Sequence, residues 1–259
     1  MKEQPITILN THSKFAGFTL VEMAIVLAIV ALLLGSLLPT ISSQIEQQRR
    51  TETRKYMDEV RDALLGYAVS NGHLPCPDIT NDGVEDIAVA VITNDVPSIG
   101  QSTGKFSCSA SLGVGQIPYN TLGVSPKDSY NSTLIYAVTP VFGERNEVYS
   151  ATNGGGTPLS SSSFNLNSAG TIHVCTAAAT PTTNPCTADL TSIATAVIIS
   201  RGANWATPTT PTLGDETENT DGDSDFVSHD FVQNGFDDLV VWLSPNTLFN
   251  RMVAAGKLP

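Results

Sequence analysis

The sequence predicts an α+β protein in which a long N-terminal helix packs on a small antiparallel β-sheet head. Residues 18–38 are almost entirely apolar, and residues 41–70 carry apolar side chains at three- and four-residue steps. From residue 73 the chain changes to short β-prone runs separated by Gly, Ser, Thr and Pro. An amphipathic helix laid across an antiparallel sheet is the simplest arrangement that buries both apolar faces.

The apolar block at residues 18–38 contains one acid, Glu22. As a helix the block would be about 31 Å long, which fits the hydrocarbon core of a bilayer, so we expect a transmembrane helix. A carboxylate in such a segment costs about 2.5–3.5 kcal/mol on insertion scales and needs a partner. Two explanations stay open: Thr19 and Glu22 have the spacing of a capping box, or Glu22 pairs with a group on another molecule.

The segment before this block has no apolar run of its own. Residues 1–17 carry Lys2, His12 and Lys14, and the hydrophobic block begins only after Gly17. A secretory signal peptide has the opposite order, with its apolar region before the cleavage site. We therefore expect residues 1–17 to be a leader that is removed while the apolar helix stays on the product.

The hexapeptide GFTLVE at residues 17–22, followed by an apolar helix, resembles the N-terminal signal of type IV pilins and of type II secretion pseudopilins. The resemblance implies that a prepilin peptidase cuts after Gly17 and methylates the amine of Phe18. It also implies that Glu22 pairs with the terminal amine of a neighbouring subunit in a filament. The precursor would then be a single-pass inner-membrane protein with a periplasmic head, and the product a cell-surface pilus or a periplasmic pseudopilus.

Composition agrees with an exported protein. Only 15% of the 259 residues are charged, and 41% are hydrophobic, which is enough for one sizeable head beyond the helix. The formal net charge of −12 argues against nucleic acid as a main ligand, because phosphate binding is driven by Lys and Arg.

Residues 39–72 continue as an amphipathic helix into the head. Tyr56, Val60 and Leu64 lie on one face suited to packing, and Asn71-Gly72 supplies a helix stop. The mixed charges between residues 46 and 61 are interpreted as a solvated face, with subunit contacts as the alternative.

The head, residues 73–259, contains four runs with strand character: residues 88–93, 133–139, 171–175 and 194–200. Residues 148–163, with three successive glycines, indicate an exposed loop or hairpin tip. At the end of the chain, residues 244–256 indicate a short helix with Ser244 as cap and Pro245 in its first position. We expect its apolar stripe to pack on the head.

The head carries an even number of cysteines, which favours disulfides in an exported protein. Three pairings can be drawn, and we select Cys76 with Cys108 and Cys175 with Cys186 because nearest neighbours close the loops between them. A zinc site is the weaker alternative, since there is no C-x-x-C pair.

Residues 214–238 hold nine acids and no Lys or Arg. The start of an EF-hand loop is present at residues 221–225, but Phe226 replaces its glycine and Val232 its final glutamate, which excludes the complete motif. A looser calcium loop stays open, because calcium accepts oxygen ligands from irregular backbone. The alternative is a solvated acidic loop without metal.

A second resemblance concerns this acidic loop. SRGAN at residues 200–204, then the acidic loop, then Asp237-Asp238 before LVVW at residues 239–242, follow the order found around the calcium loop of major pseudopilins. The resemblance implies a structural calcium ion. The candidate ligands are Asp215, Asp221, Asp223, Asp225 and Asp238.

No catalytic motif with a G-x-S-x-G, H-E-x-x-H or phosphate-cradling pattern is present, so we expect no enzyme. Together these observations favour a structural, minor subunit of a type IV pilus or a type II secretion pseudopilus, with other pilin-like subunits as partners. The alternative from another class is a membrane-tethered, non-polymerising periplasmic protein for binding or adhesion.

Overall fold

The structure is a computed structural model, and it describes residues 17–92, 101–108, 113–150, 156–158, 164–178, 187–206, 214–232 and 235–258. The chain forms two compact units, Met1–Gln47 and Gln48–Pro259. The second unit contains the head and the last turns of the long helix. Its elements are those of an α+β protein, which confirms the predicted fold class.

The long helix α1 covers Leu20–Asn71, 52 residues. It begins after Thr19 and ends at Gly72, whose φ of 82° is left-handed and whose N–H donates to the carbonyl of Ala68 at 2.8 Å. A glycine in this conformation closes a helix without steric cost, so the predicted stop is confirmed. In the first unit the described side chains at residues 17–34 are exposed. Among the helices that the structure describes, none has both the length and the apolarity needed to cross a membrane.

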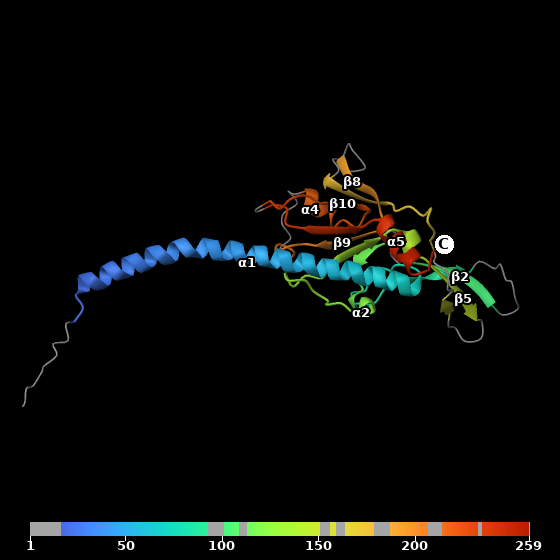
Figure 1. Cartoon of the computed structure of the whole chain (residues 1–259), viewed down its shortest axis with the longest axis horizontal. Coiled ribbons are helices and arrows are strands. Elements are labelled where there is room, and N and C mark those ends of the chain that lie inside the picture. Colours follow the sequence, from blue (N-terminus) through green and yellow to red (C-terminus); the bar gives the residue numbers. More distant parts are fainter. Residues whose placement is uncertain are drawn as a thin grey trace, which may run out of the picture. The chain divides into compact units, whose positions relative to one another are not determined.

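Within the second unit, α1 buries one face against the head. Val60, Leu64 and Ala68 recur every four residues and have no exposed surface, as the periodicity predicted. Each large apolar side chain buried in this way contributes about 1.5–3 kcal/mol. Figure 1 shows the cyan part of α1 alongside β9 and α5, whose apolar side chains belong to the same core.

The central sheet has four antiparallel strands in the order β11-β9-β4-β3. Its inner strand β9 is buried on both faces: Ala196 and Ile198 lie in the core shared with α1, while Val197 and Ile199 lie in a second core behind the sheet. This alternation follows from the two-residue period of a strand. The strands are β3 (Val114–Gln116), β4 (Ile135–Val138), β9 (Ala196–Ser200) and β11 (Leu239–Leu243).

Two further sheets complete the head, whereas the sequence predicted a single small antiparallel sheet. The sheet β10-β7-β8 contains a parallel pair, β10 with β7, and supplies Ile172, Val174 and Phe226 to the second core. The sheet β1-β2-β5-β6 is antiparallel throughout. The strands are β1 (Ile87–Ile92), β2 (Gln101–Cys108), β5 (Arg145–Ser150), β6 (Gly156–Pro158), β7 (Ile172–Ala177), β8 (Thr187–Ala194) and β10 (Asp225–Val227). Most of the unpredicted strands are polar or very short, so they lack the alternating pattern by which a strand is recognised.

In the described part of the head, three short helices lie between strands, and a fourth follows the last strand. They are α2 (Tyr119–Leu122), α3 (Pro140–Gly143), α4 (Gly214–Glu218) and, after β11, α5 (Pro245–Ala254). The predicted C-terminal helix is confirmed as α5. The Ser244 hydroxyl accepts a hydrogen bond from the backbone N–H of Thr247, and Pro245 occupies the first turn. Leu248 and Met252 are buried in the core shared with α1.

The disulfide chemistry of the head follows the expected pairing where the structure describes it. Cys76, just after α1, is bonded to Cys108 at the end of β2, and both side chains are buried. Cys175 in β7 is also disulfide-bonded. Its expected partner, Cys186, lies outside the described residues, so that second pairing stays a prediction.

Candidate functional site

The N-terminal segment presents its candidate processing residues openly. Gly17 and Phe18 precede the first residue of α1, and Phe18 is 77% exposed. Apart from its chain neighbours, no described residue has an atom within 4 Å of a Cβ built on Gly17. A short non-helical segment before a helix can enter the active site of a peptidase more readily than helical backbone. The predicted leader is residues 1–17, and its residues 1–16 lie outside the described residues.

Glu22 is exposed in the first turn of α1. Its backbone N–H donates to the Thr19 hydroxyl at 3.2 Å, which is one half of a capping box. Among the described residues, the reciprocal hydrogen bond from the Thr19 N–H to the Glu22 carboxylate is not present. The capping interpretation therefore accounts for Thr19 but leaves the Glu22 carboxylate available to another molecule.

In the head, an acidic cluster forms from Glu216, Asp237 and Asp238, of which Asp238 is the most buried and Glu216 is half-buried. One carboxylate oxygen from each of them lies within 4.8 Å of the other two. Glu216 is in α4, whereas the two aspartates precede β11. The backbone N–H of Asp237 donates to Glu216 Oε1 at 3.0 Å, which holds the two segments together.

The turn after β9 supplies the other wall of this cluster. Asp237 Oδ2 accepts the backbone N–H groups of Ala203 at 2.9 Å and Asn204 at 3.3 Å. Gly202 has a φ of 60°, and a Cβ at this position would come within 2.5 Å of the Asp237 carboxyl group, so this position requires glycine. Asp237 Oδ1 is buried and has no hydrogen-bond partner among the residues that the structure describes.

The two aspartates have perturbed acidities. Burial raises the pKa of Asp238 to about 7, although a hydrogen bond from the Asn219 amide at 2.8 Å favours the charged form. Burial, with the charge of Glu216 as a further cause, raises the pKa of Asp237 to about 6. Both shifts express the cost of crowding negative charge away from water. A bound cation would remove that cost.

The calcium candidates are not all brought together. Asp238 belongs to the acidic cluster, while Asp221 and Asp223 form a more exposed group with Glu218. Asp215 accepts the backbone N–H of Ala178 at 2.7 Å and lies 3.2 Å from Nε2 of His229. Asp225 starts β10 and is buried opposite His173. The EF-hand-like spacing of residues 221–225 therefore describes a turn leading into a strand.

Two members of the acidic cluster were absent from the predicted ligand set. Asp237 was detectable in the sequence, since it adjoins Asp238 before the LVVW segment. Glu216 has no such signal, because its position depends on how α4 packs beside β10 (Figure 1). Of the described acids, Glu216, Asp237 and Asp238 fit a calcium ion best, since they offer hard oxygen ligands and one of those oxygens is buried without a partner.

Residues 12–38 match a family model described as the prokaryotic N-terminal methylation motif. The matched segment contains Gly17, Phe18 and Glu22, and the head lies outside it. The motif supports a type IV pilin-like or pseudopilin-type protein, and it implies processing by prepilin peptidase, a membrane anchor and assembly with pilin-like subunits. A search of curated proteins and a search of solved structures each returned no match.

Proposed function

We propose that this protein is a minor structural subunit of a type IV pilus or of a type II secretion pseudopilus. It is assembled after a prepilin peptidase cuts between Gly17 and Phe18. The observation that carries the proposal is the methylation motif at residues 12–38. The exposed Gly17-Phe18 segment ahead of α1 supports it.

In this proposal the first part of α1 is the assembly surface. Its apolar side chains are exposed in the isolated chain, including Leu20, Leu27 and Leu33. Packing these side chains against the same helix of sister subunits removes them from water or lipid. A carboxylate buried in such a bundle without a partner would be costly. Pairing between Glu22 and the methylated amine of Phe18 on a neighbour offsets that cost and sets the axial register.

The head has a structural role in this proposal and no catalytic one. Glu216, Asp237 and Asp238 would hold a calcium ion, which neutralises their mutual repulsion and ties α4 to the turn before β11. Residues 73–259 make a large head, which suits a component present in few copies, because bulk hinders dense packing along a filament.

The N-terminus of the mature protein tests the processing step. We expect mass spectrometry of protein from cells that contain the peptidase to find a chain beginning with N-methylated Phe18. A Gly17→Val variant should remain at precursor length. Mature protein that keeps Met1, or begins at another residue, contradicts the proposal.

Assembly needs a separate measurement. We expect mechanical shearing to release the protein together with a filament that contains other pilin-like subunits. Correct cleavage at Phe18 without recovery in any sheared filament would favour the alternative, a membrane-tethered and non-polymerising protein for binding or adhesion.

A further inference from the structure

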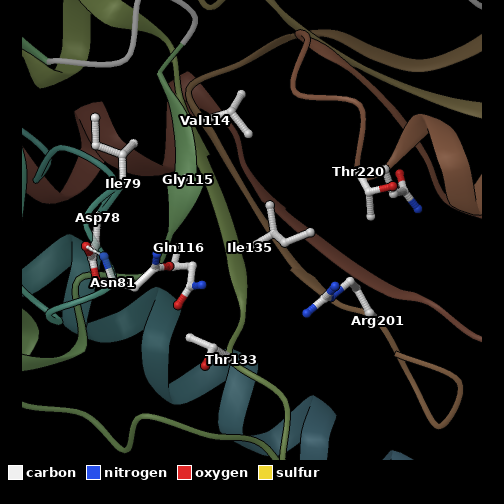
Figure 2. Close-up of a pocket in the computed structure, with 11 residues that line it drawn as sticks. Asp78, Ile79, Asn81, Val114, Gly115, Gln116, Thr133, Ile135, Arg201 and Thr220 are labelled. Carbon is white, nitrogen blue, oxygen red and sulfur yellow. Dashed lines mark hydrogen bonds between the residues drawn. The ribbon is translucent and has the colours of Figure 1, made fainter. Parts of the chain in front are cut away.

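A cavity of about 350 Å³ opens in the head at the edge of the central sheet. One wall contains Gln116 of β3 and Ile79, and the other contains Arg201, just after β9, with Thr220. Figure 2 shows the guanidinium of Arg201 pointing from its own wall toward the cavity, with Gln116 and Thr133 across from it. All of these residues belong to the second compact unit.

The Nε of Arg201 is buried and has no hydrogen-bond acceptor among the described residues, and its guanidinium carbon lies 5.8 Å from the centre of the Trp205 ring. The charge of Arg201 also lowers the pKa of Asp238, against the larger effect of burial. The position is imposed by the fold, since Ser200 pairs with Leu239 in the sheet and Gly202 makes a turn with a φ of 60°. Arg201 is therefore the first residue after the paired part of β9, and its side chain extends into the cavity.

One acid, Asp78, lines the same cavity and is held by its own loop. The Asp78 carboxylate is fully buried and accepts the backbone N–H groups of Asn81 at 2.6 Å and Gly83 at 2.7 Å. These backbone hydrogen bonds hold the Asp78 side chain within its own loop. The cavity thus combines the Arg201 guanidinium and the hydrogen-bonded Asp78 carboxylate with neutral polar groups, among them Gln116 and Thr133, and with the aliphatic side chains of Ile79 and Ile135.

We propose that this cavity binds a carboxylate that carries a short aliphatic group, with Arg201 as the residue that recognises the carboxylate. The guanidinium fork matches a carboxylate through two parallel hydrogen bonds. A single cation suits a monoanion better than a phosphate dianion, especially in a protein of net charge −12. The volume lies at the small end of the range for ligand pockets, which limits the ligand to roughly amino-acid size.

This binding function goes beyond the proposed role in a filament and does not depend on it. The carboxylate can belong to a free organic acid or to the C-terminus of a peptide. Two probes separate these sources: N-acetyl-leucine, and a hexapeptide that ends in leucine with a free carboxylate. N-acetyl-leucinamide is the matched control, because it differs from the first probe only in the missing charge.

The experiment uses the full chain in detergent micelles with a calcium chelator, and measures binding by calorimetry and saturation-transfer NMR. We expect N-acetyl-leucine to bind and N-acetyl-leucinamide to give no signal. Arg201→Ala should weaken binding by about tenfold or more, because a charge-assisted pair is lost. Arg251→Ala, which removes an exposed arginine from α5, should bind like the parent. Tighter binding of the hexapeptide would assign the site to peptide ends, and binding of N-acetyl-leucine alone to small acids.

Equal binding of the acid and the amide, or unchanged binding by a folded Arg201→Ala variant, would overturn the proposal. So would inorganic phosphate that binds as tightly as N-acetyl-leucine. If Arg201→Ala does not fold by circular dichroism, Ile79→Trp gives a second test, because Ile79 is 45% exposed at the rim and a larger side chain there narrows the cavity. An Ile79→Trp variant with normal melting and undiminished binding would also refute the site.

Discussion

Replacing Asp238 with asparagine tests the acidic cluster, because the gain in stability expected without calcium should shrink when calcium is present. Asp238 is only 5% exposed, and its pKa is raised from 3.8 to about 7. At pH 8 the Asp238 carboxylate is therefore charged in both states, and this charge is less favourable in the folded protein than in the unfolded chain. The shift corresponds to an upper limit of about 4 kcal/mol of unfavourable free energy. Asp238→Asn removes the charge and keeps an oxygen for the Asn219 amide.

Without calcium, we expect Asp238→Asn to raise the melting temperature at pH 8. For a domain of this size each kcal/mol corresponds to about 2–4 °C. With calcium at 100 times its dissociation constant, the parent should gain about 2.7 kcal/mol and the variant much less, because a ligand is lost. The assay is thermal melting of the full chain, followed by circular dichroism, in chelator and in calcium.

Asp230→Asn is the matched control, since it removes the same charge from an exposed position in the same acidic segment. It should alter neither the melting temperature in chelator nor the response to calcium. If Asp238→Asn melts at a lower temperature than the parent in chelator, the charge of Asp238 does not destabilise the folded protein, and this part of the reasoning is refuted. A full calcium response in that variant would refute the role of Asp238 as a ligand.

Four further predictions address other parts of the chain. In chelator, stability should fall as the pH rises from about 4 to about 8, because the pKa values of Asp237 and Asp238 are raised to about 6 and about 7 and the folded state binds more protons over that range; a stability that rises over this range in denaturant titrations would contradict the shifts. Replacing both Cys76 and Cys108 with serine should lower the free energy of unfolding by about 3.7 kcal/mol, given their sequence separation of 32. Urea titration measures this loss, and a negligible loss would contradict the prediction. Leu64→Ala should cost about 2–5 kcal/mol because Leu64 is fully buried, whereas Leu190→Ala, at an exposed position in β8, should change stability by less than about 0.5 kcal/mol; equal effects would argue against the packing of α1 on the head. Glu22→Ala should leave cleavage at Phe18 intact and abolish recovery in sheared filaments, while Glu59→Ala serves as a control at an exposed position of α1. Normal incorporation of Glu22→Ala would count against its role in register.

Elements whose cause is local were predictable from the chain. The end of α1 at Gly72, the buried face around Leu64 and the cap at Ser244 depend on residues within a few positions of one another. The same holds for the methylation motif, which a peptidase would recognise as a short linear segment. Strand β9 was predictable because a strand buried on both faces is a continuous apolar run.

The composition of the candidate site was decided by contacts between distant segments. Asp225 looked like a ligand beside Asp223, but its strand pairs in parallel with β7 and places it opposite His173. Glu216 reaches Asp237 across 21 residues because α4 packs beside β10, and Arg201 faces a cavity because its strand ends where β11 begins. Periodicity and caps report neighbours along the chain, so they carry no information on which strand pairs with which. Only tertiary packing determines which acids share a site and which cation lines the cavity.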